Sequence, residues 1–126
     1  MGRDAILWPV AVHLALVLLL YSWLSVVRWQ ARRGQDVASR EQAVSANLSN
    51  QFETPVLFYA LVAVLWTADA VTPAQLACAW VFALGRLPHT LIHTLTGNVL
   101  LRGGVFTINF AGLAGMWGLF LWGRLA

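Results

Sequence analysis

The sequence predicts an all-α membrane protein, a four-transmembrane-helix bundle, and three observations lead to this prediction. Hydrophobic residues make up 60% of the 126 residues and charged residues only 10%, whereas soluble domains are close to half apolar and a quarter charged. The apolar residues are gathered into four long segments. All the basic residues are arginines, and most of them flank these segments, as expected at membrane surfaces.

Length and charge narrow the class of protein further. The chain fits a single domain over residues 1–126. The net charge of +3 does not indicate a nucleic-acid partner, because the arginines form no basic face. The single cysteine, Cys78, lies in an apolar segment and excludes a disulfide framework. The first apolar run lacks a small-residue cleavage site and is followed by arginines, so we interpret it as a transmembrane helix and not as a signal peptide.

The first helix is expected over residues 5–28, which is long enough for a span of roughly 20 residues. Trp8 and Trp23 lie towards its two ends, where interfacial aromatic residues are common. The one histidine of this segment is His13. It could be functional, but a neutral histidine bonded to a neighbouring helix is the favoured interpretation.

The second helix is expected over residues 40–68, after a loop at residues 34–39. Ser39 and Gln42 have the spacing of a capping box. At 1.5 Å per residue the helix would be about 42 Å long, so its first turns would project beyond the lipid. Pro55 predicts a kink, because proline lacks an N–H and clashes with the preceding turn.

The third and fourth helices are expected over residues 73–96 and 104–123, with a loop at 97–104 between them. Thr72 followed by Pro73 is a typical helix start. The short connection before Thr72 makes the second and third helices an antiparallel hairpin. In the fourth helix, Gly115 and Gly118 each follow an alanine by four residues, a weak signal for close helix contact.

The distribution of arginines predicts the orientation in the membrane. Arg3 and Arg124 lie on the side of the two termini, and five arginines lie on the other side: Arg28, Arg32, Arg33, Arg40 and Arg102. This excess puts the first and third loops in the cytoplasm and both termini outside it.

Asn50 and Glu53 place an amide and a carboxylate at or just inside the bilayer surface, and insertion of a carboxylate is costly, roughly 2.5–3.5 kcal/mol at the membrane centre. The two residues are three apart, so on a continuous helix they share a face. Arg86 lies at a similar depth on the third helix. We therefore predict that Glu53 and Arg86 pair in the wall of a polar pocket, although such a pair could also only fix the register of the helices.

The other candidate residues lie near the same surface. His89 and His93 are four apart and could in principle bind zinc. The missing HExxH glutamate and the cation of Arg86 argue against a metal, so we predict a polar pocket wall. Arg102 could simply extend to the headgroups, or it could stabilise a thiolate. Because Cys78 is expected near the opposite surface, such a thiol would have to come from a ligand.

These residues together resemble a known family. The elements are Asn50-x-x-Glu53-Thr54, Gly85-Arg86-x-x-His89-Thr90, and Arg102 before the last helix. They resemble the membrane-associated proteins in eicosanoid and glutathione metabolism, the MAPEG family. The likeness covers roughly residues 40–122, and the two longer elements at this separation are fairly specific.

The resemblance implies a four-helix protomer in a homotrimer, with glutathione bound between protomers near the cytoplasmic face. It implies a cofactor-binding pocket that contains Asn50, Glu53, Arg86, His89 and His93. Arg102 would match the catalytic arginine that activates the glutathione thiol. The expected reactions are conjugation to glutathione, peroxide reduction or isomerisation, on lipophilic small-molecule substrates that enter from the membrane lipid.

The sequence also leaves an alternative open. Ala46 and Ser49 stand where the best-studied enzymes of the family carry arginines, and His93 stands where they carry a tyrosine. A non-enzymatic lipid-binding or scaffold protein of the same fold is therefore the second hypothesis. The short chain with compact loops resembles bacterial members, which implies an integral protein of the bacterial inner membrane.

Overall fold

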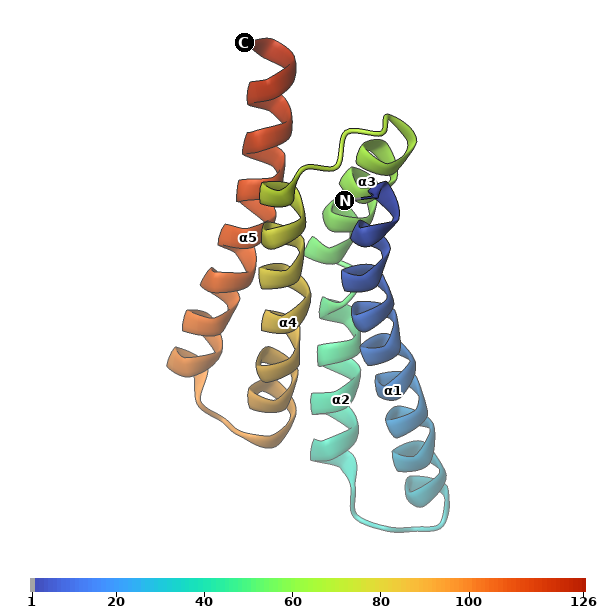
Figure 1. The fold of residues 1–126 in the computed structure, drawn as a ribbon. Coiled ribbons are helices and arrows are strands. Elements are labelled where there is room, and N and C mark those ends of the chain that lie inside the picture. The colour runs from blue at the N-terminus through green and yellow to red at the C-terminus, as the bar shows by residue number, and fades with distance from the viewer. Residues whose placement is uncertain (1) are drawn as a thin grey trace.

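The structure is a computed structural model that describes residues 2–126, and it is helical throughout. A 3₁₀ helix, η1 (Arg3–Ile6), precedes five α-helices, and no strand occurs in this range. The α-helices, drawn in Figure 1, are α1 (Leu7–Arg32), α2 (Ala38–Asn50), α3 (Thr54–Thr67), α4 (Pro73–Leu95) and α5 (Val99–Leu125). The all-α prediction is confirmed.

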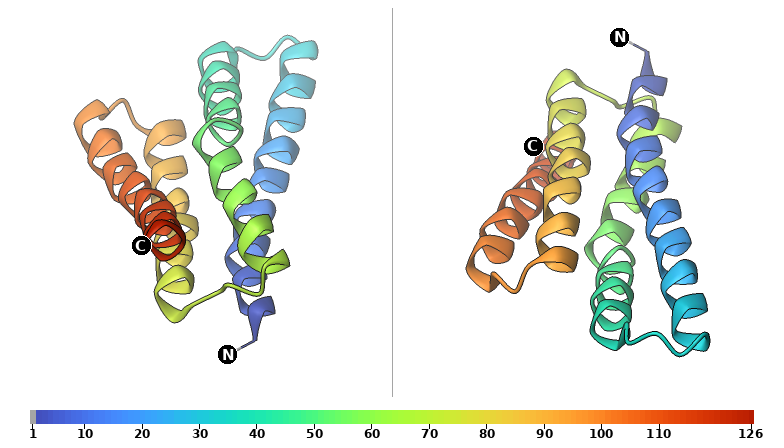
Figure 2. Two further views of the ribbon diagram at one scale, coloured as in Figure 1. Left: turned by 90° about the horizontal axis from the view of Figure 1, so that it is seen from above. Right: turned by 90° about the horizontal axis from the view of Figure 1, so that it is seen from below.

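The helices form two hairpins that pack side by side. Both chain ends lie at one end of the bundle, together with the α3–α4 connection, and the other two loops lie at the opposite end (Figure 1). We call that opposite end, with loops 33–37 and 96–98, the loop end. Helix α4 contacts α1, α2 and α5, so it is the central helix of the bundle (Figure 2).

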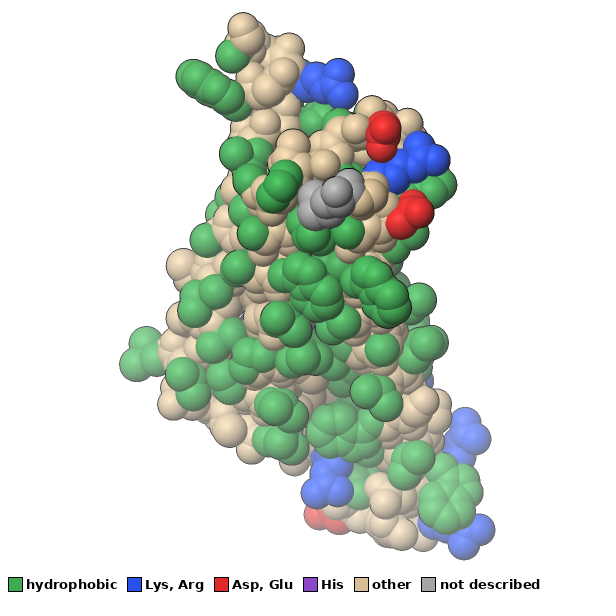
Figure 3. Space-filling model, viewed as in Figure 1, with side chains coloured by type: hydrophobic (Ala, Val, Ile, Leu, Met, Phe, Trp, Pro, Cys, Tyr) green, Lys and Arg blue, Asp and Glu red, His purple; other side chains and the backbone are tan. Residues whose placement is uncertain are grey.

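The lengths of the helices and the apolar surface of the bundle are both typical of a membrane protein. Three segments are long and apolar enough to cross a bilayer, namely Arg3–Arg32, Ala38–Thr67 and Val99–Leu125. Apolar side chains cover the middle of the face seen in Figure 3, and charged side chains gather towards its two ends. Helix α4 is less apolar because it carries polar residues that are buried inside the bundle, among them Gln75, Arg86 and His89.

The predicted helix boundaries differ from the structure at the ends. Helix α1 continues to Arg32, and α2 begins at Ala38. The predicted capping box is wrong, because the N-cap of α2 is Val37 and no side chain caps this helix. By contrast, Thr72 does cap α4, since its hydroxyl accepts a hydrogen bond from the Gln75 N–H at 3.2 Å.

The last helix starts earlier than expected. The Asn98 side chain accepts a hydrogen bond from the Leu101 N–H at 2.9 Å and so satisfies one of the free donors of the first turn. The helix then includes Arg102 and Gly103, which the sequence-based prediction places in the loop. Arg102 therefore lies in the first turns of α5.

A complete break replaces the kink predicted at Pro55. Helix α2 ends at Asn50 and α3 begins at Thr54, so the carbonyls of Asn47 and Asn50 lose their usual helical partners four residues on. Side chains replace these partners. The Asn47 carbonyl accepts from Gln51 Nε2 at 3.2 Å, and the Asn50 carbonyl accepts from Arg86 Nη2 at 3.2 Å. Such substitution is what permits broken helices at membrane depth.

Small residues bring α4 and α5 together. A Cβ on Gly112 would lie 3.1 Å from the Cys78 carbonyl oxygen, and one on Gly115 would lie 3.1 Å from Cys78 Sγ. Gly118 has open space around it. The small-residue pattern therefore predicted the contact correctly at Gly115 but not at Gly118.

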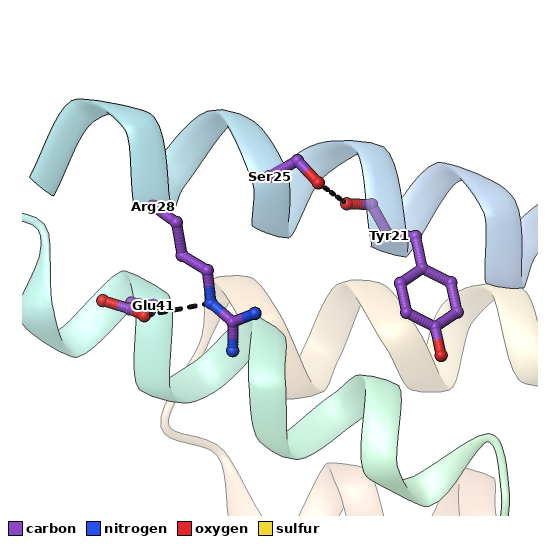
Figure 4. A network of polar contacts seen from close by, with 4 residues as sticks. All are labelled: Tyr21, Ser25, Arg28 and Glu41. Carbon is purple, nitrogen blue, oxygen red and sulfur yellow. Dashed lines mark hydrogen bonds and ion pairs between the residues drawn. The ribbon is translucent and has the colours of Figure 1, made fainter. Parts of the chain in front are cut away.

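A salt bridge links α1 and α2 near the loop end (Figure 4). Arg28 Nε lies 3.2 Å from Glu41 Oε1, and both side chains are partly exposed. It is the one ion pair within residues 2–126. A pair this exposed contributes only about 0–1 kcal/mol, so the hairpin is held mainly by the buried apolar cluster that includes Leu20, Leu24 and Val44.

Candidate functional site

A pocket of about 500 Å³ lies between α2, α4 and α5 near the loop end. This volume is within the usual range for small-molecule sites. All six candidate residues of the sequence contribute to its wall. The lining consists of Ala46, Asn50, Glu53, Thr54, Arg86, His89, His93, Val99, Arg102, Gly103 and Phe106.

Arg86 is the buried cation of the pocket wall, with no exposed surface. Its Nε and Nη2 both donate to Gln51 Oε1, each at 3.1 Å, and Nη2 also donates to the Asn50 carbonyl at 3.2 Å. The predicted ion pair with Glu53 is wrong, because no contact of this kind joins the two side chains. The helix break turns Gln51 inward and gives Arg86 a neutral acceptor.

Glu53 lines the same pocket but remains exposed at its edge. The break explains this position, since Asn50 ends one helix and Glu53 occupies the N-cap position of the next without a capping hydrogen bond from its side chain. Within residues 2–126 its carboxylate has no hydrogen-bond or ion-pair partner. The pocket wall thus contains two guanidinium groups, Arg86 and Arg102, and one carboxylate, a formal charge of +2 − 1 = +1.

The two histidines lie one turn apart on α4. His93 Nδ1 is 3.2 Å from Asn50 Nδ2, so this contact ties α4 to the last turn of α2. The His89 and His93 rings are 5.9 Å apart and nearly perpendicular. His89 is buried, and its Nδ1 has no partner among the described residues. A polar ligand in the pocket could satisfy that nitrogen.

Arg102 is half-buried in the first turns of α5. The N-terminal turns of a helix carry free N–H groups and partial positive charge. Arg102 adds a full charge at the same place, and Val99 and Gly103 border it in the pocket wall. This side of the pocket is therefore suited to an anion.

The arrangement offers little to a metal ion. No group of three or more His, Cys, Asp or Glu side chains comes together in the described part of the chain. His89 and His93 instead face a pocket that contains two arginines.

The candidate residues predicted from the sequence do not include Gln51, which lies between Asn50 and Glu53. Its signal was its place four residues before Pro55, where a helix break frees backbone groups. Phe106, an apolar residue of the pocket wall, was also missed. Its ring lies 6.1 Å from that of His89.

Long apolar helices around a polar pocket at one end define an integral membrane protein with a pocket between its helices. A model of the MAPEG family matches residues 6–122. The chain therefore belongs to the MAPEG family. Neither a comparison with curated proteins nor one with solved structures gives a match.

Proposed function

We propose that the protein is an integral membrane glutathione-dependent transferase or peroxidase that acts on lipophilic electrophiles. One observation carries this proposal. Six polar residues that lie far apart in the sequence line one pocket: Asn50, Glu53, Arg86, His89, His93 and Arg102. Their chemistry is complementary to a small zwitterionic peptide with an excess of negative charge.

The charges of the pocket fit glutathione, which carries two carboxylates and one ammonium and thus one net negative charge. Glu53 is the unpaired carboxylate at the pocket edge and suits the ammonium. Arg86 and the Asn50 side chain suit a carboxylate, because Nη1 of Arg86 has no acceptor among residues 2–126. The unpartnered Nδ1 of His89 provides a further polar contact.

Arg102 is the residue we propose for activation of the thiol. Glutathione would supply a sulfur nucleophile. A cation and a helix N-terminus both favour a thiolate over a thiol, and Arg102 combines them at the start of α5. Arg102 would therefore keep the glutathione sulfur as a thiolate, the form that attacks electrophiles.

The lipophilic substrate is proposed to enter from the membrane beside α5. Val99 and Phe106 belong to the pocket wall and are also exposed on the outer surface. An apolar molecule in the bilayer can therefore reach the pocket without crossing water. In the proposed homotrimer a neighbouring protomer would border the pocket without covering this edge.

We propose that α4 crosses the membrane together with the three apolar segments. It has 23 residues, about 35 Å of helix, against a hydrocarbon core of about 30 Å. Both chain ends then lie outside the cytoplasm, and the pocket opens towards it. The bacterial inner membrane is the proposed location.

The test is a titration of the purified protein with glutathione by calorimetry, followed by a conjugation assay with a generic electrophile. We expect saturable binding, and a rate that falls to background in Arg102→Ala. Arg124→Ala is the matched control, because Arg124 lies at the opposite end of the bundle, and it should keep the full rate. Equal background rates for wild type and Arg102→Ala would refute the proposal.

One observation favours a second candidate, a lipid-binding or scaffold protein. Ala46 places an uncharged methyl group in the pocket wall, so the site has fewer cations than the resemblance implies. A pocket of this kind would hold a fatty acid by a single carboxylate. Fatty-acid binding without measurable glutathione binding would support this candidate.

A further inference from the structure

A buried chain of polar side chains runs from the pocket into the interior of the bundle. His13, from α1, is fully buried and lies outside the pocket lining. Its Nε2 is 2.9 Å from Gln51 Oε1, and its Nδ1 is 2.6 Å from the Tyr59 hydroxyl. These hydrogen-bonded side chains thus connect α1, α3 and the helix break to Arg86 in α4.

The direction of these hydrogen bonds follows from Gln51. Its Nε2 donates to the backbone oxygen and the side-chain oxygen of Asn47, at 3.2 and 3.0 Å. This orientation of the amide leaves Oε1, which can only accept, to face His13 and Arg86. His13 must therefore carry its proton on Nε2.

The other imidazole nitrogen then has a defined role. With the proton on Nε2, the neutral ring presents Nδ1 as an acceptor, and the Tyr59 hydroxyl donates to it. A second proton on Nδ1 would make the buried His13 ring a cation. This cation would lie close to the Arg86 guanidinium, because both groups bind the same oxygen of Gln51. The neutral Nε2–H tautomer is the one that this environment supports.

We infer that His13 is a positioning residue for the pocket, acting through Gln51 on Arg86; this inference rests on the proposed glutathione site. The three donors, His13 Nε2 and Arg86 Nε and Nη2, meet on one oxygen atom. They lock the Gln51 side chain from one side while Asn47 holds it from the other. Arg86 is thereby fixed with Nη1 left for the ligand.

The same contacts support the break in the second transmembrane segment. Gln51 Nε2 and Arg86 Nη2 replace the missing helical donors at the Asn47 and Asn50 carbonyls. Asn50 itself contributes to the pocket wall. Without its donor from His13, Gln51 could rotate, and both the Arg86 side chain and the Asn50 backbone would lose their fixed positions.

The first test does not involve glutathione. Protein labelled with ¹⁵N-histidine is studied in lipid by solid-state NMR, and the His13 signals are assigned by their loss in His13→Gln. We expect His13 to be protonated on Nε2 alone. In Tyr59→Phe the Nδ1 signal should move while the signals of His89 and His93 stay in place. A His13 ring protonated on Nδ1 would overturn the inference.

The second test is a double-mutant cycle on glutathione affinity with His13→Leu, Arg86→Lys and the double variant. We expect His13→Leu to weaken binding about tenfold, the effect of one lost buried hydrogen bond. In the Arg86→Lys background the same change should alter affinity less than about twofold, because residues that act through one another are not additive. His13→Gln keeps a donor and should restore most of the affinity.

Two results would overturn the inference: an unchanged affinity in His13→Leu, or an equal loss in both backgrounds. Tyr59→Phe replaces His13→Leu in the cycle if the latter does not fold, with an expected loss of about threefold. Absence of glutathione binding by the wild type would refute the proposed function. The NMR measurement does not depend on glutathione, and it would still test whether His13 donates from Nε2 to Gln51.

Discussion

Arg86 donates two hydrogen bonds to the side-chain oxygen of Gln51, from Nε and from Nη2, each 3.1 Å long. The acceptor is neutral, so the buried guanidinium is well bonded but not neutralised by direct contact. Removing a cation from water is costly unless an anion compensates it. An anionic ligand in the pocket would supply that compensation, so we expect Arg86 to contribute binding energy as well as a structural link.

The proposed role of Arg102 can be tested by measuring how the bound glutathione thiol ionises with pH. In Arg102→Ala the glutathione thiol should ionise at higher pH than in the wild type, because the cation that stabilises the thiolate is gone. Where the thiol pKa lies above neutral pH, a pKa higher by one lowers the thiolate fraction there about tenfold. The ultraviolet absorbance of the thiolate, followed against pH, measures it. Identical titrations for wild type and Arg102→Ala would contradict the assignment.

Glu53 should recognise the ammonium group of glutathione. Glu53→Gln is expected to weaken glutathione binding by up to about tenfold, as for a charged hydrogen bond at a partly exposed site. A glutathione analogue without the amino group should bind both forms equally. Glu41→Gln is the control, because Glu41 lies outside the pocket. Equal losses for glutathione and the analogue would place the ammonium elsewhere.

Gly85 should tolerate no side chain. A Cβ at this position would collide with the side chain of Asn109, which is buried on α5. We expect Gly85→Ala to destabilise the protein by about 1–3 kcal/mol, measured as a lower thermal midpoint in detergent. Adding Asn109→Ala should recover part of the loss. Gly118→Ala, where nothing lies within 4 Å, should leave the midpoint unchanged or raise it.

The Arg28–Glu41 salt bridge should matter little. Glu41→Gln is expected to lower the free energy of unfolding by less than about 1 kcal/mol, since both side chains are partly exposed and salt screens the pair. Unfolding at low and high salt measures this difference, which should shrink at high salt. A loss of several kcal/mol would mean that the hairpin of α1 and α2 depends on charge and not on apolar packing.

The orientation in the membrane is open to chemical labelling. In a Cys78→Ala background, Gly97→Cys places a thiol in the loop between α4 and α5, and Ala126→Cys places one at the other end. We expect an impermeant reagent to label Ala126→Cys from outside the cell and Gly97→Cys only from the cytoplasmic side. The reverse pattern would overturn the arginine-based orientation.

The sequence alone predicted much of the pocket wall, for a physical reason. Polar residues in apolar segments are costly wherever they face lipid, so Asn50, Arg86, His89 and His93 had to turn inward. Their similar depth then implied a common site, and the structure places all of them in one pocket with Glu53 and Arg102. Their roles toward glutathione stay predictions.

Only the tertiary structure decided which groups touch. Spacing predicts a shared face only while a helix is continuous, and the break between Asn50 and Thr54 ends that continuity. Gln51 turns inward to Arg86 and His13, while Glu53 stays at the pocket edge. A hydrogen bond across the bundle depends on packing between helices that are far apart in the chain, and hydrophobic patterning does not contain that information.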